Sequence, residues 1–389
     1  MRVIHVGKFF PPHPGGIERT VCDLGTALAA QGVATAVLAH AEPGTHRGRT
    51  FRSDEIDVTL VACYRQLLYV PLSPGFPWRL QQLIRRFRPD LLHLHVPNTS
   101  AFSALLLGSA RRLPWVVHWH ADVAADARHP GLRVGYRLYR PWEQALLRRA
   151  RAVIATSAPY LNASAALAPW RDKVRVIPLG LGEPPAAPDR AIPAHWADTA
   201  LRVLAVGRLS YYKGFDVLLD ALALEPQAAL LLVGEGEGKA QLIDRARAIG
   251  VDSRVHFAGH VDDRTLAALY TQADVLCLPS IDRSEAFGLV LLEAMRAGLP
   301  VIASDIRGSG IGYVVRDGET GVLAPPGDAT ALAAALGRLA GDRALRRRMG
   351  EAGAQRWRDE FTLQRAAQRT LMLYRDVLGA AHNTTARTG

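Results

Sequence analysis

Two carboxylates, Glu285 and Glu293, stand eight residues apart in a segment that follows an apolar strand-like run and leads into a helical pattern. On a helix this spacing is roughly two turns, which predicts that both carboxylates share one face. We expect Glu293 to accept hydrogen bonds from a ribose diol and Glu285 to orient the hydroxyls of a sugar. Gly288 permits close approach of a ligand, and the amides of Leu289 and Val290 would supply helix N-terminal donors for a phosphate.

Two cations lie at the end of another apolar run. The run 201–207 ends directly before Arg208, and Lys213 with Gly214 opens the next helical pattern. Cations at the carboxyl edge of a parallel sheet are well placed to bind a diphosphate. Solvent exposure is the alternative for each charge alone, but their joint position at a strand end favours the diphosphate.

A glycine pair, Gly15 and Gly16, closes the loop 8–16 (KFFPPHPGG) ahead of a helical pattern over 17–31. The free N–H groups at the start of a helix can hold an anion, and glycine lets a phosphate or sugar approach the backbone. We expect the pair to contribute to a ligand site, with an ordinary turn as the alternative.

Four histidines alternate along two strand-like runs. His93 and His95 lie in LLHLHV, and His118 and His120 lie in VVHWH. A period of two places each pair on one face of its strand. Metal ligation is possible, but neither a DxD segment nor an HExxH motif accompanies them, so a structural or substrate-orienting role is favoured.

The elements that must position these residues are short apolar runs between helical patterns. In the first half the runs are 2–7, 34–39, 91–96, 115–120 and 152–156, and in the second half they are 201–207, 229–234, 255–259, 275–279 and 301–304. Such runs indicate parallel sheets covered on both faces, and hence two doubly wound α/β domains. We predict domains over 1–181 and 201–355, a proline-rich linker over 182–200 and a final helix over 356–380.

The sequence resembles retaining glycosyltransferases of the GT-B, family 4 type. The resemblance covers almost the whole chain. It is carried by PPHPGGIE, DLLHLHVPN, VVHWHAD, RVIPLGL, VGRLSYYKGFDVLL, LLLVGEGEG, SEAFGLVLLEAMRAGLPVIASD and DGETGVLAPPGD. It implies two Rossmann-like domains facing a cleft, the first for the acceptor and the second for the nucleotide sugar. The last helix, Trp357 to Leu378, would cross back to the first domain.

The resemblance also implies roles for single residues. His120 is expected to meet the donor sugar, and Asp122 to orient the acceptor. The predicted catalytic residues are His120, Glu285, Arg208 and Lys213. The predicted donor-binding residues are Gly15, Gly16, Arg208, Lys213, Glu235, Val261, Glu285, Phe287, Gly288, Leu289, Val290 and Glu293. The predicted acceptor residues are His95 and Asp122, and neither a metal nor a cofactor is expected.

One departure from the family pattern concerns the donor. Where the family commonly has Gly-Gly-x-x-Glu, this chain has the segment 307–313, RGSGIGY. Together with HWHAD and RDKVRVIPLGL, this segment resembles the mannosyl- and rhamnosyltransferases of O-antigen (lipopolysaccharide) and exopolysaccharide assembly. It implies transfer of mannose from GDP-mannose to a lipid-linked saccharide on polyprenyl diphosphate. A UDP-hexose or GDP-rhamnose donor is the alternative.

Composition excludes several other classes. The chain has 389 residues, of which 49% are hydrophobic and 21% charged, which is typical of globular domains. Its three cysteines, Cys22, Cys63 and Cys277, form no CxxC pair, which excludes a disulfide framework and a structural zinc site. Neither glycine cluster has the G-x-G-x-x-G spacing of a nicotinamide enzyme. The cysteine usage also predicts a reducing, cytoplasmic location.

The net charge of +11 is concentrated in the first half, where residues 1–180 hold 23 basic and 11 acidic side chains. This asymmetry suggests a polyanionic partner. Nucleic acid is the remote alternative, since no helix-turn-helix, RNP or zinc pattern is present. We predict peripheral binding to the anionic inner face of the cell membrane.

The predicted docking segment is 78–88. Its Leu80, Leu83, Ile84 and Phe87 share one helical face flanked by arginines. The alternative is that this face packs on its own sheet.

Overall fold

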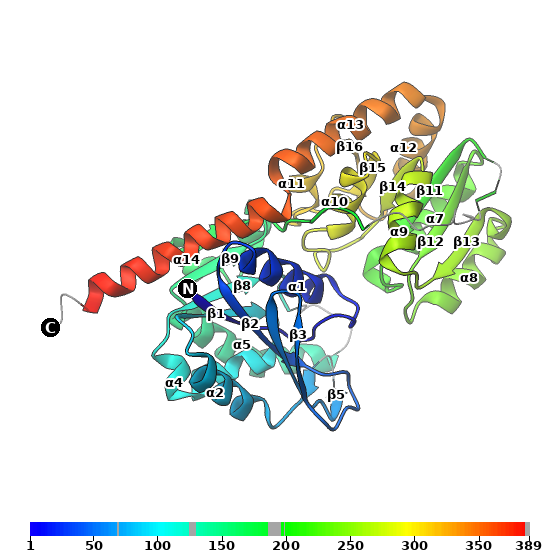
Figure 1. The fold of residues 1–389 in the computed structure, drawn as a ribbon. Helices are drawn as coiled ribbons and strands as arrows, with labels where there is room; N and C mark the ends of the chain where they lie inside the picture. The colour runs from blue at the N-terminus through cyan, green and yellow to red at the C-terminus, as the bar shows by residue number, and fades with distance from the viewer. Residues whose placement is uncertain (68–69, 124–129, 186–195, 198, 386–389) are drawn as a thin grey trace. The chain divides into compact units, whose positions relative to one another are not determined.

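The computed structural model describes residues 1–67, 70–123, 130–185, 196–197 and 199–385. Most of the predicted linker therefore lies outside the described residues. The chain divides into two compact units, and both are α/β, as predicted. Unit 1 comprises residues 1–180 and 363–389, and unit 2 comprises residues 181–362 (Figure 1).

Unit 1 is built on an eight-stranded sheet of order β10-β9-β8-β7-β1-β2-β4-β3. Its strands are β1 (Arg2–Val6), β2 (Ala34–His40), β3 (Arg49–Ser53), β4 (Ile56–Val61), β7 (Leu91–Val96), β8 (Trp115–Trp119), β9 (Ala152–Ala155) and β10 (Val174–Val176). All neighbouring pairs are parallel except β3 with β4. Every residue of β7 and β8 is buried, which explains why these strands are almost continuously apolar.

Helices cover the sheet of unit 1. They are α1 (Gly16–Ala29), α2 (Phe76–Phe87), α3 (Ser103–Leu106), α4 (Gly108–Arg111), α5 (Pro130–Arg149), α6 (Ala158–Ala163) and α14 (Leu363–Thr385), with 3₁₀ turns η1 (Thr99–Phe102) and η2 (Ala168–Lys173). The strands β5 (Arg65–Leu67) and β6 (Val70–Leu72) form a separate antiparallel pair. None of the helices among the described residues combines the length and the apolar character needed to cross a bilayer.

The apolar face of α2 faces the interior, so the predicted docking role of this face is wrong. Leu80, Leu83, Ile84 and Phe87 are only 0–9% exposed. Burying each such side chain is worth about 1.5–3 kcal/mol, which favours packing on the protein's own core over facing solvent. The helix ends at Phe87, and its C-cap Arg88 adopts a left-handed conformation ahead of Pro89.

Unit 2 is built on a six-stranded parallel sheet of order β13-β12-β11-β14-β15-β16. Its strands are β11 (Leu201–Val206), β12 (Ala228–Val233), β13 (Val255–Gly259), β14 (Val275–Leu278), β15 (Val301–Ser304) and β16 (Gly321–Ala324). Its helices are α7 (Phe215–Leu224), α8 (Lys239–Ala248), α9 (Asp263–Gln272), α10 (Leu289–Arg296), α11 (Ile311–Val314), α12 (Ala329–Gly341) and α13 (Arg343–Glu360), with 3₁₀ turns η3 (Tyr211–Lys213) and η4 (Asp252–Arg254).

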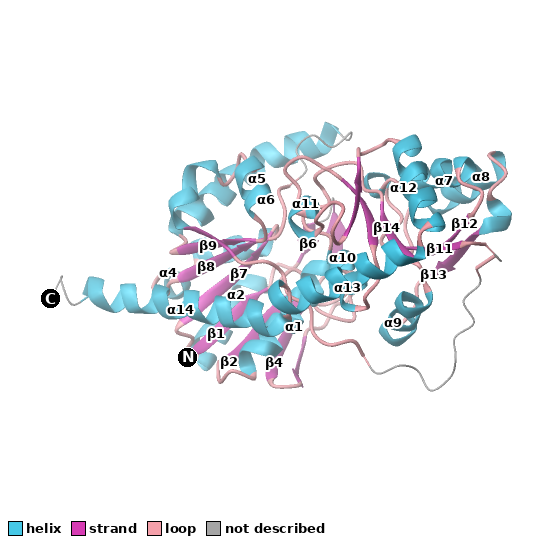
Figure 2. Ribbon diagram, turned by 90° about the horizontal axis from the view of Figure 1, so that it is seen from above, coloured by secondary structure: helices cyan, strands magenta, loops and turns pink. Residues whose placement is uncertain are grey.

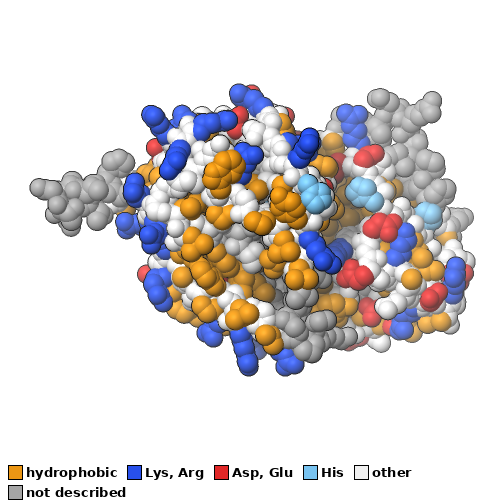
Figure 3. All heavy atoms as spheres, turned by 90° about the horizontal axis from the view of Figure 1, so that it is seen from below, with side chains coloured by type: hydrophobic (Ala, Val, Ile, Leu, Met, Phe, Trp, Pro, Cys, Tyr) orange, Lys and Arg blue, Asp and Glu red, His pale blue; other side chains and the backbone are white. Residues whose placement is uncertain are grey.

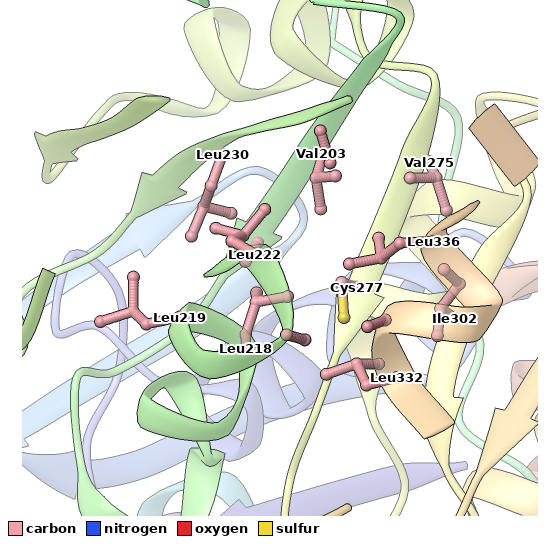
Figure 4. Packing of buried hydrophobic residues seen from close by; sticks show 14 of the residues in the cluster. Val203, Leu218, Leu219, Leu222, Leu230, Val275, Cys277, Ile302, Leu332 and Leu336 are labelled. Atoms are coloured by element: carbon pink, nitrogen blue, oxygen red, sulfur yellow. The ribbon is translucent and has the colours of Figure 1, made fainter. Parts of the chain in front are cut away.

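The core of unit 2 lies between this sheet and the helices α7 and α12 (Figure 4). Val203 and Leu230 reach it from the strands, Leu218 from α7, and Leu332 and Leu336 from α12. All five side chains are almost completely buried, so this sheet has its own complete core.

The last helix, α14, returns to unit 1, as predicted. Its Leu371 and Tyr374 belong to a buried cluster with Leu24 and Leu28 of α1. Figure 2 shows α1 and α14 next to each other over the first sheet. The helix begins at Leu363, so Trp357 belongs to α13 of unit 2 and not to the crossing helix.

Candidate active site

The order in which successive strands are added to the unit 2 sheet reverses between β11 and β14. From β11 the chain passes to β12 on one side, whereas β14 lies on the other. Ligands of doubly wound sheets bind at such a switch point, beyond the carboxyl ends of the strands. Lys213 follows β11 through η3, and Glu285 follows β14, so both sides of the switch point carry a charged residue.

Lys213 and Glu285 form a buried ion pair. The Lys213 Nζ lies 2.6 Å from Glu285 Oε2, and the two residues are 7% and 8% exposed. Ser280 Oγ donates a second hydrogen bond, of 3.0 Å, to the same carboxylate oxygen. Burial is the largest single influence and acts to lower the pKa of Lys213, but the charge of Glu285, its hydrogen bond to Lys213 and the nearby Tyr212 and Glu293 together outweigh burial, so the pKa is raised. The ammonium therefore stays charged.

Gly214 lets the two loops come together. It has a φ of 64°, and a side chain there would overlap the carbonyl oxygen of Pro279 at the end of β14. Only glycine combines that backbone conformation with such close approach. The ion pair thus depends on a small residue directly after Lys213.

The two glutamates do not share a helical face, so that prediction is wrong. The helix α10 begins only at Leu289, because its N-cap Gly288 has a left-handed φ of 82°. Glu285 therefore lies in the preceding loop. Glu293 lies on α10 and accepts a 2.7 Å hydrogen bond from the hydroxyl of Tyr270. Burial raises the pKa of Tyr270 well above its usual value, which keeps this donor protonated.

The other donor-site candidates of unit 2 follow strands at the same carboxyl edge. Arg208 follows β11 and lies 3.5 Å from Glu237, and Glu235 follows β12 and pairs with Lys239 at 2.7 Å. The remaining candidates are half-buried Val261 after β13, buried Phe287 and Gly288 after β14, and half-buried Leu289 and Val290 in the first turn of α10. The structure thus brings all the predicted unit 2 residues to one edge of one sheet.

The segment 307–313 supports the Glu285 loop. Ser309 Oγ donates a 2.5 Å hydrogen bond to the backbone oxygen of Glu285, and the amide of Gly310 donates to the backbone oxygen of Ala286 at 2.8 Å. Neither Ser280 nor Ser309 was predicted from the sequence. The unusual Gly-Ser-Gly segment was the signal that could have identified Ser309.

In unit 1, five buried histidines form a stack on one face of β1, β7 and β8. Strand register places His5 beside His93 and His95 beside His118, and His120 follows at the end of β8. All five are 0–5% exposed. His5 was not predicted from the sequence, because the pairing of β1 with β7 is a long-range contact that local periodicity does not reveal.

Burial lowers the pKa of every histidine in this stack, to about 3 for His5 and His120, so the rings are neutral. Two groups of three have nitrogens close enough to suggest a metal. However, each group contains a face-to-face pair: the ring centroids are 4.4 Å apart for His93 with His95 and 4.2 Å apart for His118 with His120. Lone pairs of stacked rings lie in parallel planes and do not converge on one ion, so the donor set fits a zinc ion poorly.

His95 cannot serve as a direct acceptor contact. It is 1% exposed, and both of its ring nitrogens are engaged by neighbouring histidines. Asp122 is half-buried, and its Oδ1 accepts hydrogen bonds from Trp119 Nε1 at 2.9 Å and from Ser164 Oγ at 2.6 Å. Its carboxylate is therefore held in a fixed orientation.

The start of α1 already holds a carboxylate. Gly15 is the N-cap of this helix, and a side chain at Gly15 would overlap the carboxylate of buried Glu18. Burial raises the pKa of Glu18, although a hydrogen bond from its own amide opposes this. The predicted anion position at Gly15 and Gly16 is thus occupied by a side chain of the same helix, which the sequence analysis did not foresee.

Comparison with known families gives two matches. Residues 192–356 match the family described as glycosyl transferases group 1, and residues 15–180 match the glycosyl transferase 4-like domain.

Similar proteins span nearly the full chain. The O-antigen chain mannosyltransferase C of Escherichia coli is 30% identical, with 97% of this chain and 99% of that protein covered. A D-rhamnosyltransferase of Pseudomonas aeruginosa is 32% identical, over 93% and 92%. A glycogen synthase of Mycobacterium tuberculosis is 33% identical, over 96% and 94%. Among solved structures, the sucrose-phosphate synthase of Thermosynechococcus elongatus matches with a TM-score of 0.80 at 27% identity, over 98% and 100%.

Proposed function

The chain belongs to the family of group 1 glycosyl transferases, and from this premise we propose that it transfers mannose from GDP-mannose, with retention of configuration, to a lipid-linked saccharide. The acceptor would be carried on polyprenyl diphosphate and would belong to a cell-surface polysaccharide. Support comes from the full-length similarity to an O-antigen mannosyltransferase and from the Gly-Ser-Gly segment at 308–310. Unit 1 would take the acceptor and unit 2 the nucleotide sugar.

The observation that carries the proposal is the buried ion pair at the switch point of unit 2. Buried ion pairs contribute little net stability, because desolvation offsets their attraction, so a pair at this position is better explained by ligand binding. We assign Lys213 and Arg208 to the diphosphate of the donor and Glu285 to the hydroxyls of its sugar. Glu293 would bind the ribose.

The proposed reaction needs no protein nucleophile. The bond between the sugar's anomeric carbon and the diphosphate breaks, and the acceptor oxygen bonds to that carbon on the same face. The acceptor's hydroxyl proton passes to an oxygen of the departing diphosphate. Lys213 and Arg208 would stabilise the negative charge that develops there, at about 3 kcal/mol per contact.

The donor can be identified with a panel of nucleotide sugars. GDP-mannose should raise the melting temperature more than UDP-glucose or GDP-rhamnose at equal concentration, because selective binding stabilises the folded state by mass action. Turnover with the same panel, and NMR of the product's anomeric centre, complete the test. The rhamnosyltransferase relative makes GDP-rhamnose a relevant competitor, and UDP-glucose represents the UDP-hexose alternative. Preference for either one, or an inverted product, would contradict the proposal.

A lipid-linked acceptor requires contact with a membrane, and unit 1 offers a surface other than the buried face of α2. Eight large apolar side chains between residues 64 and 142 are exposed, against two among the described residues of unit 2. We call these eight the apolar surface: Tyr64, Leu67, Leu72, Trp78, Leu106, Val134, Leu138 and Trp142. In Figure 3, hydrophobic side chains gather on one face with Lys and Arg around them.

The elements that carry the apolar surface contact one another. Helix α2 contacts α3, and both β6 and α5 contact the turn η1. Exposed Arg65 and Arg137 lie among the apolar residues, and the Arg79 guanidinium lies 4.8 Å above the Trp78 ring. Each arginine near an anionic leaflet contributes about 1 kcal/mol. We propose that this surface docks on anionic lipid.

Sedimentation with anionic and with neutral vesicles tests the docking. Leu106→Asp should reduce sedimentation with anionic vesicles, because it places a carboxylate among buried acyl chains. Leu224→Asp is the matched control, since Leu224 is an equally exposed leucine of unit 2 (58% against 63%). Equal binding of both variants, or binding that ignores lipid charge and salt, would contradict the proposed surface.

A further inference from the structure

Three histidines of the buried stack are joined end to end by hydrogen bonds. His5 Nδ1 lies 3.0 Å from His95 Nε2, and His95 Nδ1 lies 2.9 Å from His120 Nε2. This chain of hydrogen bonds runs across three neighbouring strands, since His5 lies on β1, His95 on β7, and His120 directly after β8. Its His120 end is 5% exposed, whereas its His5 end is fully buried.

The two hydrogen bonds must run in the same direction. A neutral imidazole has one N–H donor and one bare nitrogen acceptor. Because His95 uses both of its nitrogens in the chain, donating in one bond forces it to accept in the other. Either every proton points toward His120, or every proton points toward His5.

The buried end decides between these directions. If the protons pointed toward His5, its Nε2 would carry an N–H, and this nitrogen is buried without a partner among the described residues. Among backbone groups, buried N–H donors without an acceptor are rarer than buried acceptors without a donor, and the same desolvation argument applies to an imidazole N–H. The opposite direction leaves only a bare nitrogen at that end.

We propose that His5 and His95 fix the tautomer of His120, so that His120 presents an Nδ1–H donor to a sugar hydroxyl of the substrate. His5 donates to His95, His95 donates to His120 Nε2, and the proton of His120 is thereby confined to Nδ1. His5 and His95 are positioning residues that need not touch the substrate. The inference rests on the proposed glycosyl transfer and on the sugar contact that the family resemblance implies for His120.

The surroundings of the chain support a neutral, rigid arrangement. His93 and His118 stack on the rings of His95 and His120 at centroid distances of 4.2–5.3 Å. His93 is itself held by a 2.5 Å hydrogen bond to the hydroxyl of Tyr374 on α14. Burial lowers the pKa of all members, so an additional proton that would break the directional order is disfavoured.

The tautomer can be measured directly on the full-length protein labelled with ¹⁵N-histidine. Protonated and bare ring nitrogens have well-separated ¹⁵N shifts, and we expect the Nδ1 of His120 to be protonated and its Nε2 bare. A proton on Nε2 would overturn the proposal, and this readout needs no variant. If His120→Phe transfers sugar normally while Nδ1 carries the proton in the wild type, the tautomer assignment stands and the proposed sugar contact fails.

Kinetics of three variants test the positioning role. His95→Phe should lower kcat about tenfold with little change in KM for the donor, because the lost hydrogen bond frees the His120 tautomer. His95→Asn should recover much of this loss, since its amide can donate from the place of Nδ1. The matched control is His93→Phe. His93 is as buried as His95 and this variant also loses a hydrogen bond, but His93 does not belong to the hydrogen-bonded series of His5, His95 and His120. An equal loss of kcat in His95→Phe and His93→Phe, or no rescue by Asn, would overturn the role of His95.

Discussion

The Lys213–Glu285 pair is costly to break from either side, because each partner left alone would be a buried charge without compensation. Stability and catalysis therefore depend on the same two side chains. Measurements that separate binding, turnover and unfolding are needed to assign their roles.

Replacing Lys213 is predicted to lower both turnover and stability. Lys213→Ala should lower turnover by about a hundredfold or more, as loss of one donor to developing negative charge does, and should destabilise unit 2 by about 3–5 kcal/mol. Steady-state kinetics and chemical denaturation measure the two losses. The control is Arg245→Ala, which breaks the exposed pair with Asp220 and should cost at most about 1 kcal/mol without affecting turnover. Near-normal turnover of Lys213→Ala would refute its assignment to the diphosphate.

The two glutamates are expected to differ in a calorimeter. Glu293→Gln should weaken binding of GDP, because a neutral hydrogen bond to ribose replaces a charge-assisted one. Glu285→Gln should bind GDP normally and transfer sugar slowly. Tyr270→Phe removes the hydroxyl that donates to Glu293 but keeps the carboxylate, so it should retain GDP binding. The reverse pattern would show that the two roles are exchanged.

The buried carboxyl group of Glu143 makes the free energy of unfolding depend on pH. Burial raises the pKa of Glu143 on α5 from 4.5 to about 7, although hydrogen bonds from Tyr136 and Gln144 act to lower it. Because the folded state holds this proton more tightly than the unfolded state, stability is lost as pH rises from 4.5 to 7. Glu143→Gln should thus raise the free energy of unfolding by about 2–3 kcal/mol at pH 8 and by little at pH 4. Denaturation at both pH values, with exposed Glu351→Gln as control, checks this; equal gains at both would refute it.

At the scale of elements, α14 carries a prediction that two adjacent residues can test. Leu371 is buried in the cluster with α1, whereas Met372 is 57% exposed. Leu371→Ala should cost about 2–5 kcal/mol, and Met372→Ala should stay within about 0.5 kcal/mol. Urea denaturation measures both. Similar small losses would mean that α14 contributes little to the core of unit 1.

Sequence patterns predicted element types better than the faces of those elements. The α/β alternation, the carboxyl-edge position of Lys213 and Glu285, and the returning last helix all follow from local signals. The amphipathic pattern of α2 was compatible with both a membrane and a core, and only the tertiary packing of Leu80 and its neighbours distinguishes them. At α10, a single left-handed Gly288 separated two carboxylates that periodicity had placed on one face.

Long-range contacts explain what the sequence analysis missed. His5 joins the histidine stack because β1 pairs with β7, about 90 residues later in the chain. Ser309 supports Glu285 from a loop that follows another strand. Glu18 turns back onto the helix that carries it, and its burial is decided by the surrounding packing. None of these contacts leaves a periodic pattern in the sequence.

At the scale of the whole molecule, the two units have separate cores. Among the described residues, the unit 2 cluster around Leu218 contains no residue of unit 1, and the unit 1 clusters around Tyr374 and Val58 contain none of unit 2. We therefore expect two calorimetric transitions. GDP should raise the temperature of one, by mass action, and Leu371→Ala should lower the other. A single transition that responds to both perturbations would contradict independent unfolding.

The path of the chain has a consequence for synthesis on the ribosome. Unit 2 is one continuous stretch, residues 181–362, whereas unit 1 lacks α14 until the residues from Leu363 onward have been made. The part of the protein that begins first is thus finished last. Until then, the patch formed by Leu24, Leu28 and their neighbours has no covering helix, and the nascent chain presents it to chaperones and proteases. In a protein fragment that ends at residue 180, this apolar patch would stay uncovered permanently. To obtain unit 1 alone, the sequence of α14 must be joined to residues 1–180.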